Sequence, residues 1–145
     1  MPTIDAGRCM GMAIVHDLAE CETGDIVPPE HGGLDIRVKG RLEREAMERI
    51  CKEEEGGGIR ELWEEYERRE SAEALLVKDC DVLEMLVQAL EYEILNPGGG
   101  VECGGFFEGM KEGGKGSRFE ATKDLYKEIL RRREELWEGR EGGRR

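Results

Sequence analysis

The segment from Ser71 to Leu95 is the most apolar part of the chain, and it constrains the fold more than any other feature. Its apolar residues recur at helical spacing but cover more than one face; they are Leu75, Leu76, Val77, Leu83, Met85, Leu86, Val87 and Leu90. A helix that is apolar around most of its circumference is buried among other elements. Ser71 is a favourable N-cap residue. The sequence therefore predicts a central buried helix that the rest of the chain covers.

The remaining regular segments are amphipathic, with apolar residues at three- and four-residue spacing. The predicted helices, besides 71–95, are residues 7–22, 35–54, 59–70 and 118–138. Gly24 should end the first of them, because glycine is favoured just past a helix C-terminus. No segment has the two-residue alternation of a strand, so we expect an all-α fold.

Two segments outside these helices are expected to add nothing to the core. Residues 96–117 are rich in glycine, which makes ordering entropically costly, and are predicted to be a flexible loop. Within it we expect 98–116 to lack stable structure and a catalytic role, with local packing of "GGFFEGM" left open. Residues 139–145 are predicted to be a disordered tail.

The charge balance limits the partners. The chain has 22 basic and 34 acidic residues, a net charge of -12. Such a surface repels nucleic acid polymers and anionic membranes, so neither is expected as a partner. The sequence has no apolar run long enough to span a membrane, and because its first ten residues lack the basic start and apolar run of a signal peptide, we expect none. Its five cysteines form no CxxC pair, which favours reduced thiols and an intracellular, most simply cytoplasmic, location.

Acidic and imidazole side chains gather at unusual places. His16, Asp17 and Glu20 are expected to share one helix surface, and imidazole with carboxylate suits a divalent transition metal. Asp25 follows the helix end closely enough to fold back over this patch. Asp81 interrupts the apolar helix, and a buried carboxylate must be paired or must bind a cation.

Simpler interpretations remain open for each of these residues. The His16–Asp17 dipeptide can be an exposed surface pair, and Glu20 can be a solvated helix acid. Asp25 can cap a loop, since glycine–aspartate turns are common. Asp81 can be a member of an ion pair with Lys78 or Arg69. Spacing alone therefore gives moderate support to a metal site.

Longer stretches carry a resemblance to a known family. The stretches are "CMGMAIVHDLAECETGDIVP", "KGRLEREAM", "ELWEEYE" and "SAEALLVKDCDVLEMLVQALEYE". In this order and at these distances they resemble the HD-domain phosphohydrolases of the 5'-deoxynucleotidase type, over roughly residues 8–95. The resemblance implies an all-α HD-domain helical bundle, with residues 1–95 as a partial HD metal-dependent phosphohydrolase domain.

The resemblance also implies roles for single residues. The family's HD pair and distant aspartate match His16, Asp17 and Asp81, which would hold a divalent cation such as Mn, Co, Mg, Fe or Zn. Glu20 and Asp25 match catalytic acids, which would bind a second cation or handle protons. The backbone carbonyl of Ile26 would join that second site. Lys39 matches a lysine that would contact the phosphate of the substrate.

One part of the family pattern has no match. The family's first metal-binding histidine lies in an earlier helix, and residues 1–15 contain no histidine. We therefore expect a bundle that lacks its first helices and a weakened hydrolase of deoxynucleoside 5'-monophosphates, with a homodimer left open. The alternatives are an inactive HD-fold fragment and a helical interaction module.

Overall fold

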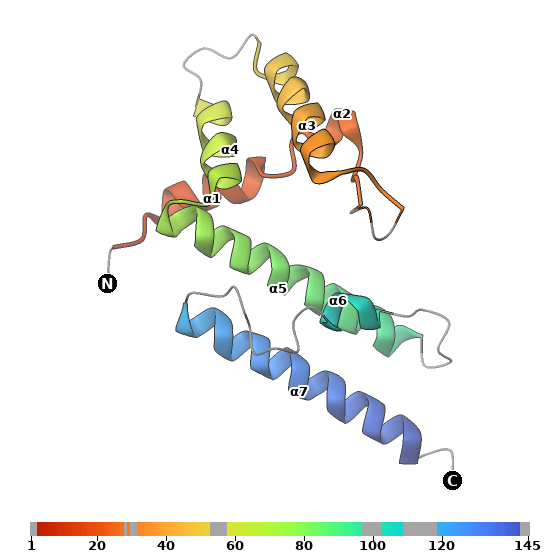
Figure 1. The fold of residues 1–145 in the computed structure, drawn as a ribbon. Coiled ribbons are helices and arrows are strands. Elements are labelled where there is room, and N and C mark those ends of the chain that lie inside the picture. Colours follow the sequence, from red (N-terminus) through yellow and green to blue (C-terminus); the bar gives the residue numbers. More distant parts are fainter. Residues whose placement is uncertain are drawn as a thin grey trace. The chain divides into compact units, whose positions relative to one another are not determined.

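The structure is a computed structural model, and it describes residues 3–27, 29, 32–52, 58–96, 103–108 and 119–142. The helices, shown in Figure 1, are α1 (Ala6–Val15), α2 (Glu20–Thr23), α3 (Ile36–Ile50), α4 (Gly58–Arg68), α5 (Ala72–Leu95), α6 (Gly104–Glu108) and α7 (Glu120–Gly142). Every regular element of the described residues is an α-helix, which confirms the predicted fold class. None of these helices combines the length and the apolar character needed to cross a membrane. The chain divides into two compact units, Met1–Ala74 and Leu75–Arg145.

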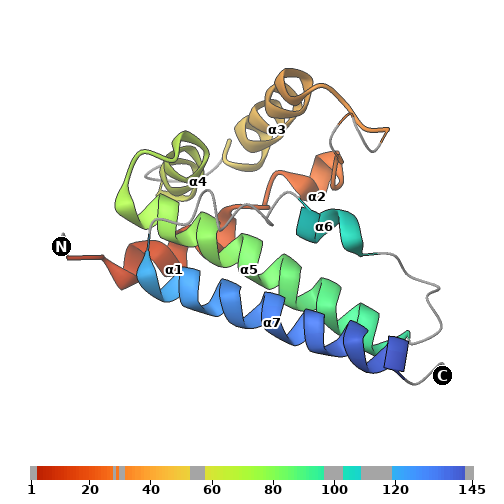
Figure 2. The same ribbon diagram turned by 60° about the horizontal axis from the view of Figure 1, so that its bottom comes forward.

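In the first unit α1 packs against α4, and α2 packs against α3 (Figures 1 and 2). Its buried cluster consists of Val15, Ala19, Ala46, Met47 and Trp63, with Leu18, Ile50, Cys51 and Leu62 partly buried around it. Gly11 makes the approach of α1 to α4 possible, because a Cβ atom there would lie 2.9 Å from Leu62 Cδ1. The apolar faces of α3 and α4 contribute to this core as their spacing predicts, through Ala46 and Trp63. In α1 the spacing of Met10 and Ile14 predicts an inward stripe, and this prediction is wrong, because these side chains are 63% and 81% exposed and Met12 and Val15 are buried instead.

The first predicted helix is interrupted, so the prediction of one helix over 7–22 is wrong. Residues 16–19 form a turn between α1 and α2. There the N–H of Leu18 donates to Val15 O at 3.0 Å and the N–H of Glu20 donates to Asp17 O at 2.9 Å. These bonds span three residues instead of four, which tightens the chain and ends α1. Gly24, with a φ of 70°, ends α2 as predicted.

Other boundaries follow local capping. Asp35 caps α3 by accepting a hydrogen bond from the N–H of Arg37 at 2.8 Å. Ser71 Oγ accepts from the N–H of Ala74 at 3.1 Å, which confirms it as the N-cap of α5. α3 ends at Ile50, short of the predicted residue 54, and residues 53–57 lie outside the described residues.

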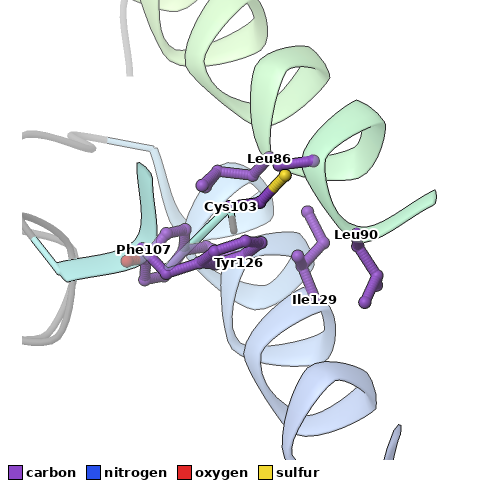
Figure 3. Close-up of a cluster of buried hydrophobic side chains, with 7 residues drawn as sticks. Leu86, Leu90, Cys103, Phe107, Tyr126 and Ile129 are labelled. Carbon is purple, nitrogen blue, oxygen red and sulfur yellow. The ribbon is translucent and has the colours of Figure 1, made fainter. Parts of the chain in front are cut away.

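In the second unit α5 and α7 run side by side in the same direction (Figures 1 and 2). The buried cluster between them and α6 consists of Leu86, Ala89, Leu90, Cys103, Phe107, Tyr126 and Ile129 (Figure 3). Phe107 has no exposed surface and Cys103 is 4% exposed. The prediction that 98–116 lacks structure is therefore wrong for residues 103–108. The rest of the predicted loop, residues 97–102 and 109–117, lies outside the described residues.

Among the described residues of this unit, Glu93 is the most deeply buried charge, with 1% of its surface exposed. It accepts two hydrogen bonds from Arg133, each 2.9 Å long, and a third from Trp137 Nε1 at 3.1 Å. The Arg133 guanidinium also lies 4.3 Å from the ring centroid of Phe107. These contacts tie α5, α6 and α7 together.

The C-terminal helix is longer than predicted. α7 continues through Gly142, so the prediction of a disordered tail is wrong for residues 139–142, and 143–145 lie outside the described residues. Ion pairs at three- and four-residue spacing stabilise the preceding turns, as between Arg132 and Glu128 at 2.8 Å. Because these ion pairs stabilise the helix, α7 continues past Gly139, although the predicted helix ends at residue 138.

Candidate metal site

His16 is held in one orientation at the end of α1. Its Nδ1 lies 2.9 Å from the carbonyl oxygen of Ala13. A carbonyl can only accept, so Nδ1 carries the hydrogen and donates it. The imidazole lies against the buried ring of Tyr66 on α4 in an edge-type contact, with 5.2 Å between the ring centroids and 62° between the ring planes. The turn, the carbonyl and the aromatic ring together fix which nitrogen is left to bind a ligand.

That nitrogen, Nε2, lies 3.1 Å from Oδ2 of Asp17. In a neutral imidazole with hydrogen on Nδ1, Nε2 is an acceptor, and a carboxylate oxygen is an acceptor too. Two acceptors at this distance attract each other only through a positive charge, which is a proton on Nε2 or a cation bound to both. Bond lengths of about 2.0–2.2 Å from each atom to a divalent metal are compatible with this separation. The pair therefore fits a metal ion chemically.

A second group of polar atoms surrounds the ammonium of Lys39. Its Nζ lies 3.2 Å from the carbonyl oxygen of Ile26, 3.4 Å from Glu43 Oε1 and 3.5 Å from Glu20 Oε1. These three acceptors come from the loop after α2, from α3 and from α2. The structure thus brings together Glu20, Ile26 and Lys39, three of the residues predicted for the site, and adds Glu43.

The electrostatics of this group come from burial and from neighbouring carboxylates. Burial raises the pKa of Glu20, and the charges of Asp17 and Asp25 raise it further. Burial also raises the pKa of Glu43, although Lys39 opposes this. Burial lowers the pKa of Lys39, but the Glu43, Glu20 and Asp25 carboxylates outweigh it, so the pKa of Lys39 is raised. The ammonium therefore stays charged and offsets part of the acidic repulsion.

Two other predicted site residues are Asp25, in the first unit, and Asp81, in the second. Asp25 is exposed in the loop after α2, and its charge acts on Glu20 and Lys39. Asp81 lies on α5 in the second unit, half-buried, with Lys78 Nζ 2.6 Å from its Oδ2. One of the simpler interpretations of Asp81, an ion pair with Lys78, is thus present. The convergence of Asp81 with His16 and Asp17 stays a prediction.

Within the part of the chain that the structure describes, no group of three His, Cys, Asp or Glu side chains is suited to hold a metal ion. Two residues of the site were missed from the sequence, Glu43 and Tyr66. Glu43 could have been found, because it lies four residues after Lys39 and in register with the buried Ala46 and Met47. The spacing of Tyr66 from Leu62 and Trp63 predicts that it faces inward, but nothing in this spacing indicates a contact with His16.

Comparisons with known proteins identify a family for this chain. The family model described as HD domain matches residues 1–111. The chain is 47% identical over 96 residues to the 5'-deoxynucleotidase HDDC2 of Danio rerio, which covers 64% of this chain and 47% of that relative. It is 45% identical over 95 residues to the protein of the same name from Homo sapiens, covering 63% of this chain and 46% of the relative.

A fungal relative extends the match. The 5'-deoxynucleotidase hdd1 of Schizosaccharomyces pombe is 34% identical over 149 residues, which covers 94% of this chain and 69% of that relative. The chain spans about half the length of the animal relatives it matches.

The protein is all-α, and its histidine–aspartate dipeptide, His16–Asp17, lies at the C-terminal end of α1. The chain belongs to the HD-domain family. Phosphohydrolases of this family generally depend on divalent metal ions.

Proposed function

We propose that this chain carries the metal-dependent site of a 5'-deoxynucleotidase, which hydrolyses deoxynucleoside 5'-monophosphates to deoxynucleosides and phosphate. The observation that carries the proposal is the Nε2–Oδ2 separation of 3.1 Å between His16 and Asp17, with the tautomer set by Ala13. The relatives named 5'-deoxynucleotidase supply the reaction and the substrate class.

In this proposal Nε2 of His16 and the carboxylates of Asp17 and Asp81 hold the cation, one of Mn, Co, Mg, Fe or Zn. A bound divalent ion lowers the pKa of a water molecule and polarises a phosphoryl oxygen. The hydrogen bond to Ala13 and the contact with Tyr66 keep His16 in the binding orientation. This fixed orientation reduces the entropy that binding costs.

Glu20 and Asp25 handle the protons of the reaction. The attacking water loses a proton to a carboxylate as its oxygen bonds to phosphorus. The bond from phosphorus to the 5'-oxygen breaks, and that oxygen receives a proton. A carboxyl group with a raised pKa exchanges protons more readily near neutral pH, and the pKa of Glu20 is raised by burial and by Asp17 and Asp25.

The test is phosphate release from each deoxynucleoside 5'-monophosphate with added Mn²⁺ or Co²⁺, with the ribonucleotides as a specificity control. We expect turnover that requires the metal and is abolished by Asp81→Ala. Glu84→Ala, an exposed acid on the same helix, serves as the matched control and should leave the rate unchanged. Activity that is indifferent to Asp81 would refute the site, and absence of turnover from folded, metal-loaded protein would favour an inactive HD-fold fragment.

A further inference from the structure

Lys39 lies where the acidic residues after the HD pair would be expected to bind a second cation. Its Nζ is 3.5 Å from Glu20 Oε1 and 3.2 Å from the carbonyl oxygen of Ile26. These are two of the three groups, with Asp25, that the family resemblance assigns to a second metal ion. The positive charge that this structure offers them comes from the protein itself.

Among the described residues, the acceptors around the Lys39 ammonium match its N–H groups in number. A lysine ammonium has three N–H groups. Three acceptors face it, the third being Glu43 Oε1 at 3.4 Å. A phosphate oxygen at Nζ would compete with these acceptors for the same N–H groups. The geometry thus favours Lys39 as a partner of the protein's own carboxylates over Lys39 as a phosphate ligand.

Lys39 belongs to α3, so the helix backbone holds its position in the site. Glu43 is 8% exposed and lies one helical turn after Lys39, so the pair forms on a rigid element before any ligand arrives. A divalent cation on Glu20 and the Ile26 carbonyl would have to displace the ammonium. The displaced ammonium would leave Glu43 buried and unpaired, which is unfavourable.

We propose that Lys39 supplies the second positive charge of this site in place of a second divalent cation, and that it positions Glu20 beside Asp17. This proposal rests on the proposed function, which gives the site its role in phosphate ester hydrolysis. Its test measures bound metal and does not depend on turnover. Lys39 is a positioning residue here, because it acts on the substrate through Glu20.

The test counts bound Mn²⁺ per chain by equilibrium dialysis and elemental analysis at saturating free metal. Lys39→Met keeps the unbranched apolar stem and removes the charge, so it should bind one more Mn²⁺ per chain than the wild type. Adding Glu20→Gln to this variant should remove the additional ion. Lys127→Met is the matched control, since Lys127 is an exposed lysine paired with Asp124 at 3.0 Å, and its count should equal that of the wild type.

A second variant guards against misfolding. Lys39→Met combined with Glu43→Gln removes both charges of the pair on α3, leaves no unpaired buried carboxylate, and should also gain one ion. Circular dichroism establishes that each variant is helical before the count is made. A metal count equal to that of the wild type in both folded variants would overturn the proposal. A gain of one ion from a wild type that binds none would support it while contradicting the metal ligands of the proposed function.

Discussion

Truncation of Phe107 should destabilise the second unit far more than truncation of its neighbour Phe106. Phe107 has no exposed surface, whereas Phe106 is 51% exposed, so the two form a matched pair within α6. Removing a fully buried phenylalanine ring costs about 3–5 kcal/mol of unfolding free energy. The guanidinium of Arg133, 4.3 Å from the ring centroid, adds about 0.5–1 kcal/mol. We therefore expect a loss of about 4 kcal/mol or more for Phe107→Ala.

The assay is urea unfolding monitored by circular dichroism. With a slope of about 2 kcal/mol per molar urea, a loss of 4 kcal/mol lowers the midpoint by about 2 M. Phe106→Ala should cost about 1 kcal/mol at most, since half of its ring already faces water. Phe107→Leu keeps most of the apolar volume and should cost less than about 1.5 kcal/mol. Equal losses for the two alanine variants would refute the assignment of α6 to the core.

Two further predictions concern buried and partly buried charges. Glu93→Ala leaves Arg133 without its carboxylate partner and should cost about 3–5 kcal/mol in the same urea assay, whereas Glu91→Ala, exposed on the same helix, should be nearly neutral. The Arg8 guanidinium, with Nε 2.6 Å from Glu65 Oε2, holds the pKa of that carboxyl below 4.5, so its stabilisation is present above pH 4.5 and is lost as the pH falls through the lowered pKa. The stability difference between the wild type and Arg8→Met should therefore be larger at pH 7 than at pH 3, and a difference that is the same at both values would contradict this assignment.

The helices could be predicted from the sequence because their determinants are local. The apolar spacing, Gly24 as a terminator and Ser71 as an N-cap depend on residues within one or two turns of the helix end. The turn at residues 16–19 could not be predicted in this way. Its backbone hydrogen bonds join residues three positions apart, whereas those of an α-helix join residues four positions apart. The apolar residues of the sequence keep helical spacing through the turn, so the sequence does not reveal it.

The parts of the core and the site that were missed depend on contacts between distant residues. Phe107 lies among glycines, and its burial depends on α5 and α7, which no local pattern reports. Tyr66 touches His16 across fifty positions of sequence. Glu43 differs, because its spacing from Lys39 and its place on the buried face of α3 are visible in the sequence. An acid on an apolar stripe was used to single out Asp81, and the same criterion applies to Glu43.

The most direct test of the metal site is the dissociation constant for Mn²⁺ or Co²⁺, measured by isothermal titration for the wild type, Asp81→Ala and Glu84→Ala. The proposed site requires Asp81 of the second compact unit to share one cation with His16 and Asp17 of the first. Loss of a neighbour that only orients a ligand weakens metal affinity by about 10–100-fold, so loss of a ligand should cost at least about tenfold. We predict that loss for Asp81→Ala and wild-type affinity for Glu84→Ala. Equal affinity in the wild type and Asp81→Ala, or no binding by the wild type, would contradict the proposed site.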